Sequence, residues 1–268
     1  MKQTTIARPA ALEGIGIHSG SPCRVAFSPA APNSGIVFIK AGKRIPALAE
    51  NVVDTRRGTS LPGIAVVEHL LSAIHGSGLD NLEIGIEGDE VPALDGSALP
   101  FLAALEQAGK VEQAPDRKMV AVREPVKFSD GEASIEALPF NGLKIDFMVK
   151  FAGIGEEKLS FLFDPAAYKK QIAPARTFGY LDEVEALHRA GRALGASEKN
   201  ALILGKEGFV NPPRFPDEPV RHKILDLLGD LLLLGAPLSA AIVARRSGHK
   251  LNVELAGQLR RKLINDRA

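Results

Sequence analysis

The chain has 268 residues, of which 45% are hydrophobic and 24% charged, and its formal net charge is +1. This composition is typical of a globular protein with one large domain or two ordinary ones, and it excludes a disordered chain. A net charge so close to zero gives no electrostatic basis for nucleic acid as a partner.

The first residues, the apolar runs and the cysteine content together indicate the cellular compartment. Residues 1–20 lack the continuous apolar stretch of a signal peptide. No run approaches the ~18 apolar residues of a membrane span. Cys23 is the only cysteine, so a disulfide framework is excluded and a reducing environment is favoured. We therefore expect a cytoplasmic protein without a transmembrane segment.

The first half of the chain predicts strands and two helices. Alternating apolar residues indicate strands, whereas apolar runs that end at glycines indicate helices. The predicted elements are strands around 24–27 and 36–39, a helix over about 67–77, strands joined by a tight polar turn within 81–96, and a helix over 99–108.

The second half repeats this order after a polar segment, 110–118. Because strands and helices are segregated rather than alternating, we expect an α+β protein. We place the domains at 1–113 and 118–268. The predicted elements are strands within 119–137, 143–151 and 158–163, a helical stretch over 182–194, a strand over 200–205, a helix over about 218–234, a strand within 239–248 and a helix over 252–266.

The predicted helix VRHKILDLLGDLLLLG (220–235) carries a polar stripe. His222, Asp226 and Asp230 recur at every fourth position, so they share one side of the helix, while the leucines can face a core. One interpretation is the solvent-facing edge of an amphipathic helix. The other is chemical, because a His and an Asp one turn apart can converge on one metal ion.

A second polar interruption occurs in AVVEHLLSAIHG (65–76), where Glu68 and His69 begin an apolar helix. A carboxylate there is costly to bury unless it is paired or works near a metal. Either Glu68 is a capping residue and His69 a core histidine, or His69 is a metal ligand and Glu68 reaches a water on the same ion.

Together, His69, His222 and Asp226 would form a three-ligand site with an open position, the arrangement of a catalytic zinc. A metal there lowers the pKa of water to about 7, and a nearby carboxylate can complete its deprotonation. Two histidines and one carboxylate also occur in non-haem iron enzymes. That alternative is less favoured, because such enzymes place the triad on a β-barrel, whereas two of these ligands share a helix.

Two shorter motifs offer further groups. In RRSGHKLN (245–252), His249 follows a strand at a glycine, and a bond from Asp230 would favour its imidazolium form. A turn on the surface is the simpler interpretation of this histidine. In ARTFG (175–179), Thr177 could offer a hydroxyl to an oxyanion and Phe178 an apolar face to a sugar ring.

These motifs in this order resemble the UDP-3-O-acyl-N-acetylglucosamine deacetylase family, the zinc enzymes of lipid A biosynthesis. The resemblance covers nearly the whole chain. It rests on GIGIHSG (14–20), VEHLLSAIHGSGLDN (67–81), ALDGSALPF (93–101), ARTFG (175–179), VRHKILDLLGD (220–230) and SGHKLN (247–252).

The resemblance implies two similar α+β domains, each a sheet with helices on one face, with the helix layers packed together between the sheets. It implies a monomer that deacetylates an acylated amino-sugar nucleotide with Zn²⁺, or Fe²⁺ in the same site.

The implied metal ligands are His69, His222 and Asp226. The implied catalytic residues are Glu68 as general base, His249 oriented by Asp230 as the acid, and Thr177 at the oxyanion. The implied substrate contacts are Lys223 near the metal, Phe178 on the glucosamine ring, Arg246 on a phosphate and Phe151 on uracil. The segment after Phe178 matches an insert that forms an acyl-chain passage.

The nucleotide-binding end departs from the family pattern. Lys150 precedes Phe151 where the family often has an acidic residue, and Ala133 stands nearest to an expected basic residue. Two alternatives therefore remain beside the UDP-linked substrate. One is a zinc amidohydrolase of the same fold acting on another N-acyl amino sugar without a strict need for UDP. The other is a catalytically silent sugar-nucleotide binding protein.

Overall fold

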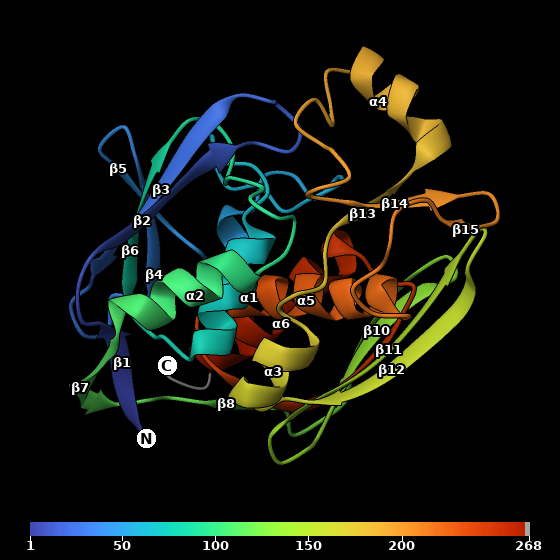
Figure 1. Cartoon of the computed structure of the whole chain (residues 1–268). Helices are drawn as coiled ribbons and strands as arrows, with labels where there is room; N and C mark the ends of the chain where they lie inside the picture. Colours follow the sequence, from blue (N-terminus) through green and yellow to red (C-terminus); the bar gives the residue numbers. More distant parts are fainter. Residues whose placement is uncertain (266–268) are drawn as a thin grey trace.

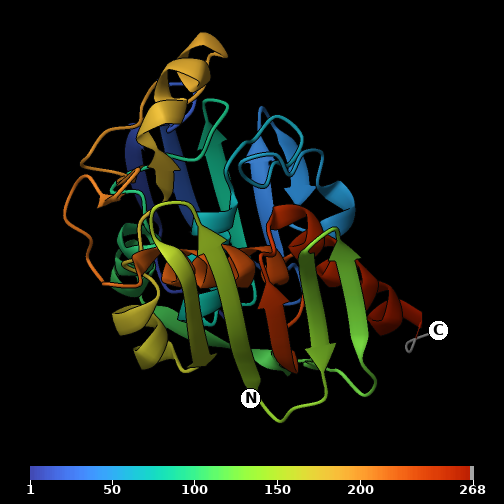
Figure 2. The ribbon, with the colours of Figure 1, turned by 90° about the vertical axis from the view of Figure 1, so that its right-hand side faces the viewer.

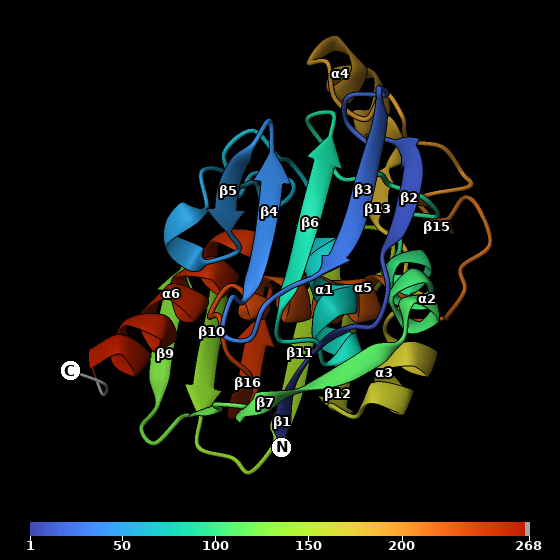
Figure 3. The same cartoon turned by 90° about the vertical axis from the view of Figure 1, so that its left-hand side faces the viewer.

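The alternating strands of the two halves assemble into two separate sheets in a computed structural model that describes residues 1–265. Figure 3 faces the first sheet and Figure 2 the second. In spatial order, the first sheet contains β2 (Ala10–Ile15), β3 (Pro22–Pro29), β6 (Leu82–Glu87), β4 (Ile36–Lys40) and β5 (Lys43–Pro46). The second contains β12 (Gly155–Leu162), β11 (Leu143–Phe151), β16 (Leu238–Arg245), β10 (Ala133–Leu138) and β9 (Val126–Asp130), with β8 (Val120–Ala121) paired to β16.

The two sheets have the same topology. Taken in chain order within each half, the strands lie in the spatial order first, second, fifth, third, fourth. In each sheet the fifth strand is parallel to the third (β6 with β4, β16 with β11), and the other three neighbouring pairs of the five strands are antiparallel. The prediction of two similar α+β domains is therefore confirmed.

The four long helices, α1, α2, α5 and α6, lie between the sheets, as Figure 1 shows. In each half one long helix precedes the fifth strand and another follows it: α1 and α2 flank β6, and α5 and α6 flank β16. The helices are α1 (Glu68–Ser77), α2 (Leu99–Ala108), α3 (Pro165–Gln171), α4 (Val184–Arg189), α5 (Glu218–Leu232) and α6 (His249–Asn265), with short 3₁₀ turns η1 (Ala49–Asn51) and η2 (Leu181–Glu183).

Apolar side chains from both sheets and from the helices form one continuous buried core. Phe27 and Phe38 contribute from the first sheet, and Phe147 from the second. The faces of α1 and α5 that meet between the sheets are buried as well. The metal-ligand candidates sit on these two helices, so the core gives them a rigid backing.

Two smaller sheets complete the chain. β1 (Lys2–Ile6) pairs with β7 (Lys110–Asp116). β13 (Phe178–Tyr180), β14 (Leu202–Gly205) and β15 (Gly208–Phe209) form the other beside α4, which projects from the body in Figure 1. Within residues 1–265, no helix has both the length and the apolar character needed to span a membrane.

Three predicted elements differ from the structure. Only β6 forms within 81–96, because the positive φ of Leu94 and Gly96 turns the remaining segment into a loop held by isolated bridges. The polar segment 110–118 is largely the strand β7, whose partner β1 lies about a hundred positions earlier in the sequence and so leaves no local signal. The stretch predicted as helix over 182–194 yields the 3₁₀ turn η2 and the short α4, since the chain turns at Gly191 with φ 66°.

The last helix begins earlier than predicted, at His249 rather than at residue 252. Asp266, the predicted end of this helix, lies outside the described residues.

Candidate metal centre and active site

The polar stripe of α5 does not face solvent. His222, Asp226 and Asp230 are all buried, as are Leu225 and Leu228 elsewhere on the helix. The interpretation as the wet edge of an amphipathic helix is therefore wrong. The stripe lies toward α1 at the centre of the molecule, where burial of a carboxylate requires a partner.

A close helix contact brings His69 to this stripe. At Gly229 of α5, an added Cβ would lie 2.1 Å from the Glu68 carbonyl oxygen at the start of α1. Only glycine permits such an approach of one backbone to another. The N-terminus of α1 is thereby placed against α5, next to Asp226.

Three side chains converge at this point. The Nε2 atoms of His69 and His222 lie 3.5 and 3.3 Å from Oδ1 of Asp226. The two imidazole rings meet edge to face, with their centroids 4.9 Å apart. One ligand atom from each of the three residues lies within 4.8 Å of the others, the geometry of a group that can hold one ion.

The donor set fits a divalent cation. Among residues 1–265, Asp226 Oδ1 is buried without a hydrogen-bond partner, while Oδ2 accepts from Lys223 Nζ at 2.6 Å. Nδ1 of His222 donates to the Ala175 carbonyl at 3.2 Å, which leaves the Nε2 lone pair free to ligate. Burial lowers the pKa of His222 to about 4, so this ring is neutral, as a ligand must be. Burial opposes ionisation of Asp226, but the charges of His222 and Lys223 hold its pKa well below the usual range.

Glu68 lies at the first position of α1 beside the three ligands. Its Oε2 accepts the backbone N–H of Thr59 at 2.8 Å. Burial raises the pKa of Glu68, with the charges of His249 and His69 acting in the opposite direction. A carboxylate with a raised pKa is a stronger base, which suits proton abstraction from water.

His249 and Asp230 form the expected pair. Nδ1 of His249 donates to Oδ2 of Asp230 at 2.9 Å, and the same oxygen accepts from Nδ2 of Asn252 at 2.9 Å. Oδ1 of Asp230 accepts from the Thr59 hydroxyl at 2.6 Å. Burial alone would lower the pKa of His249, but the Asp230 charge and hydrogen bond raise it to about 9. A protonated imidazole is thus held at the site. The interpretation of His249 as a residue of a surface turn is therefore wrong.

A cavity of about 240 Å³ opens onto these groups. Its lining includes Glu68, the three ligand candidates, His249 and Lys223, together with Thr177 and Phe178. Thr177 is fixed by its backbone, whose N–H donates to Gly96 O and whose carbonyl accepts from Leu202, both at 2.8 Å. These eight residues come from four separate segments of the chain, so spacing in the sequence alone does not show that they meet.

The predicted nucleotide contacts, Arg246 and Phe151, lie outside the lining of this cavity. The guanidinium of Arg246 pairs with Glu132 on the β9–β10 hairpin. Phe151 packs against Phe178 with ring centroids 4.9 Å apart.

The insert between β13 and β14 covers one side of the cavity. Leu187 of α4, Ala193 and Ile203 contribute apolar surface to the lining. The backbone N–H groups of Leu194 and Gly195 donate to the carbonyls of His18 and Ile17 at 3.1 Å each, so the insert is tied to the first half of the chain. Together these side chains make an apolar channel on this side of the cavity, and such a lining suits an alkyl chain.

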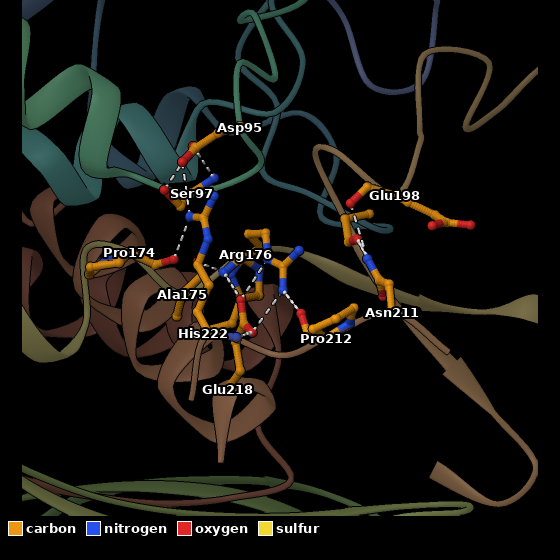
Figure 4. Close-up of polar contacts among 12 residues, drawn as sticks. Asp95, Ser97, Pro174, Ala175, Arg176, Glu198, Asn211, Pro212, Glu218 and His222 are labelled. Carbon is orange, nitrogen blue, oxygen red and sulfur yellow. Dashed lines mark hydrogen bonds and ion pairs between the residues drawn. The ribbon is translucent and has the colours of Figure 1, made fainter. Parts of the chain in front are cut away.

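A buried ion pair fixes the start of α5, as Figure 4 shows. Arg176 donates from Nε to Oε1 of Glu218 at 2.9 Å and from Nη2 to Oε2 at 3.1 Å. Glu218 also accepts the backbone N–H groups of Arg176 and Arg214. The side chain of Arg214 reaches Asp95 of the first half at 2.9 Å. Since Arg176 follows Ala175, this network also holds the carbonyl that orients His222.

Sequence reasoning missed four residues that support the site: Thr59, Arg176, Glu218 and Asn252. Arg176 and Asn252 lie within the quoted motifs ARTFG and SGHKLN, and a Glu at the start of a buried helix is itself a signal of pairing. Thr59 lies in a loop with no periodicity, so only the folded structure brings it to the site.

The chain is similar to known proteins over nearly its whole length. Residues 3–261 match the family model described as UDP-3-O-acyl N-acetylglycosamine deacetylase. A protein of Syntrophotalea carbinolica is 41% identical over 96% of this chain and 87% of its own length. Proteins of Campylobacter curvus and Thermosynechococcus vestitus are each 42% identical over 95% of this chain and over 90% and 92% of their own lengths. All three are named UDP-3-O-acyl-N-acetylglucosamine deacetylase.

Proposed function

Because the chain belongs to the UDP-3-O-acyl N-acetylglycosamine deacetylase family, we propose that it hydrolyses the acetamide of UDP-3-O-acyl-N-acetylglucosamine to the free amine and acetate. In this proposal the reaction takes place in the cytoplasm as a step of lipid A biosynthesis, on a monomeric enzyme. The observation that carries the proposal is the buried, unpartnered Oδ1 of Asp226, which faces two imidazole nitrogens beside Glu68.

His69, His222 and Asp226 would hold Zn²⁺, with Fe²⁺ as the other ion suited to the same ligands. When bound, the ion would supply Lewis-acid polarisation of the acetyl carbonyl and lower the pKa of water. The channel formed by the insert would take the 3-O-acyl chain.

The remaining chemistry belongs to side chains of this chain. Glu68 takes a proton from the attacking water as the new carbon–oxygen bond forms. Thr177 and His249 stabilise the negative charge that develops on the carbonyl oxygen. When the carbon–nitrogen bond breaks, His249 transfers its proton to the leaving nitrogen, and Asp230 stabilises the imidazolium until then.

The assignment of roles predicts separable defects. Asp226→Asn should abolish stoichiometric zinc binding, because an amide is a poor ligand, whereas Asp230→Asn should keep the metal and lose turnover. Glu68→Ala should bind zinc nearly normally and lose kcat by about 10²- to 10⁴-fold. Zinc content by elemental analysis and acetate release would be measured for each variant.

Glu185→Ala, on the exposed face of α4, is the control and should behave like the original protein. Full activity in Glu68→Ala would contradict the proposed base, and normal zinc content in Asp226→Asn would contradict the proposed ligand set.

A second candidate is the same hydrolysis on an N-acyl amino sugar without UDP. It is favoured by one observation: Arg246, the expected phosphate contact, is engaged by Glu132. Rates of acetate release from the UDP-linked acylated substrate and from its UDP-free counterpart would decide between the two. We expect a clear preference for the UDP-linked substrate, and equal kcat/KM values would favour the second candidate.

A further inference from the structure

Thr59 is a loop residue that bonds two carboxylates of the site, those of Glu68 and Asp230. It is fully buried between η1 and α1. Its backbone N–H donates to Oε2 of Glu68 at 2.8 Å, and its hydroxyl donates to Oδ1 of Asp230 at 2.6 Å. One residue of the first half therefore binds both the proposed base and the carboxylate that orients the proposed acid.

The bond to Asp230 determines how that carboxylate is oriented. Oδ2 of Asp230 already accepts from His249 and Asn252, both at 2.9 Å. Thr59 supplies the bond to the other oxygen. With donors on both oxygens, the plane of the carboxylate is fixed, and the Nδ1–H of His249 has one direction in which to point.

The loop that carries Thr59 is built closely around Glu68. The Thr59 carbonyl accepts the backbone N–H of Val67 at 3.0 Å, immediately before α1. The preceding residue, Gly58, has φ 148°, and a Cβ there would lie 3.1 Å from Oε1 of Glu68. The loop thus contacts the carboxylate directly, and the position of Thr59 is tied to the first turn of α1.

We propose that Thr59 is a positioning residue that couples the base on the first domain to the His249–Asp230 pair on the second. The proposal rests on the function proposed above. Its physical basis is that a buried carboxylate with an unfilled oxygen rotates or recruits another donor, which displaces the group bound to its other oxygen.

Two substitutions of Thr59 distinguish the bond from its hydroxyl to Asp230 from the bond between its backbone N–H and Glu68. Thr59→Val keeps the shape and the N–H but removes the donor to Asp230, whereas Thr59→Ser keeps both. Thr59→Val should lower kcat about 10- to 100-fold, with KM and zinc content nearly unchanged, and Thr59→Ser should restore most of kcat.

Ser72→Ala is the matched control. Ser72 is a fully buried hydroxyl on α1 that bonds only the Tyr168 hydroxyl among the described contacts, at 2.9 Å. Its loss should lower the melting temperature and leave kcat unchanged at temperatures well below the transition. A fall in kcat of the same size in Ser72→Ala and Thr59→Val would show that Thr59 acts only through stability, and would overturn the proposal.

A spectroscopic readout is independent of turnover. In zinc-loaded protein with ¹⁵N-labelled histidine, the Nδ1 proton of His249 should shift in Thr59→Val and keep its position in Thr59→Ser. If the original protein releases no acetate, the proposed function fails while this measurement still tests the coupling. An unchanged His249 signal or an unchanged kcat in Thr59→Val would overturn the coupling itself.

Discussion

At the scale of single residues, hydrogen bonds orient the polar side chains of the candidate site. Lys223 fills one oxygen of Asp226 and leaves the other to face the two imidazoles. The Ala175 carbonyl fixes the tautomer of His222. Since a buried group without a partner costs free energy, these bonds both stabilise the fold and restrict the ligands to one geometry.

His75 shows the cost of burial in a residue away from the proposed chemistry. Its ring is only partly exposed and packs against Phe163, and its Nδ1 is buried without a hydrogen-bond partner among residues 1–265. Burial and the positive charge of Arg117 lower the pKa of His75 to about 4, although the Leu228 carbonyl acts in the opposite direction.

We predict a pH-dependent loss of stability from this histidine. An unfolded histidine has a pKa of about 6.5, so below that pH the unfolded chain binds a proton that the folded chain refuses. The contribution of His75 to the free energy of unfolding should therefore be constant above about pH 6.5 and fall by up to about 3 kcal/mol as the pH decreases toward 4. Urea denaturation across this range would measure it.

His75→Gln should remove that part of the slope. His222, whose pKa burial also lowers to about 4, contributes equally in both proteins, so the difference between them isolates His75. Identical slopes in the two proteins would contradict the assignment.

At the scale of elements, the contact between α1 and α5 decides whether the ligands meet. Of the proposed ligands, His69 comes from one helix and His222 and Asp226 from the other, and Gly229 permits the close approach of the two helices. In most helices a glycine lowers stability relative to alanine, by about 0.5–1 kcal/mol. At position 229 the close approach of α5 to α1, which only glycine permits, outweighs this loss of stability.

Replacing Gly229 with alanine should therefore destabilise the protein, by about 1–3 kcal/mol, because the new Cβ would overlap the Glu68 carbonyl. Relief of this overlap would move α1 away from α5, and His69 with it. Zinc binding, measured by chelator competition, should therefore weaken. Gly257→Ala on α6 is the control, since its Cβ would lie 3.5 Å from Ala49, an ordinary contact, and it should be neutral or slightly stabilising. Equal effects of the two substitutions would refute this role of Gly229.

At the scale of the whole molecule, the sequence predicted most long elements and, through the family resemblance, the layers, and it named three side chains, His69, His222 and Asp226, that the fold brings together. The helices at 67–77, 99–108 and 218–234 were predictable because their periodicity and terminal glycines are local signals. The strand β7 was not, because its pairing with β1 depends on contacts across the chain. For the same reason the sequence contains no sign that Thr59 reaches Asp230, which lies 171 positions further along.

The repeated strand order has a consequence for how such a site originates. Two halves with identical topology are the pattern left by duplication and fusion of one ancestral unit, and α1 and α5 are equivalent helices in that repeat. In a dimer of such a unit, both copies of this helix would carry the same residues. In this chain the two helices differ: His69 lies in the first turn of α1, whereas His222 and Asp226 lie further along α5. Joining two halves in one chain therefore lets each half supply a different part of the proposed metal centre.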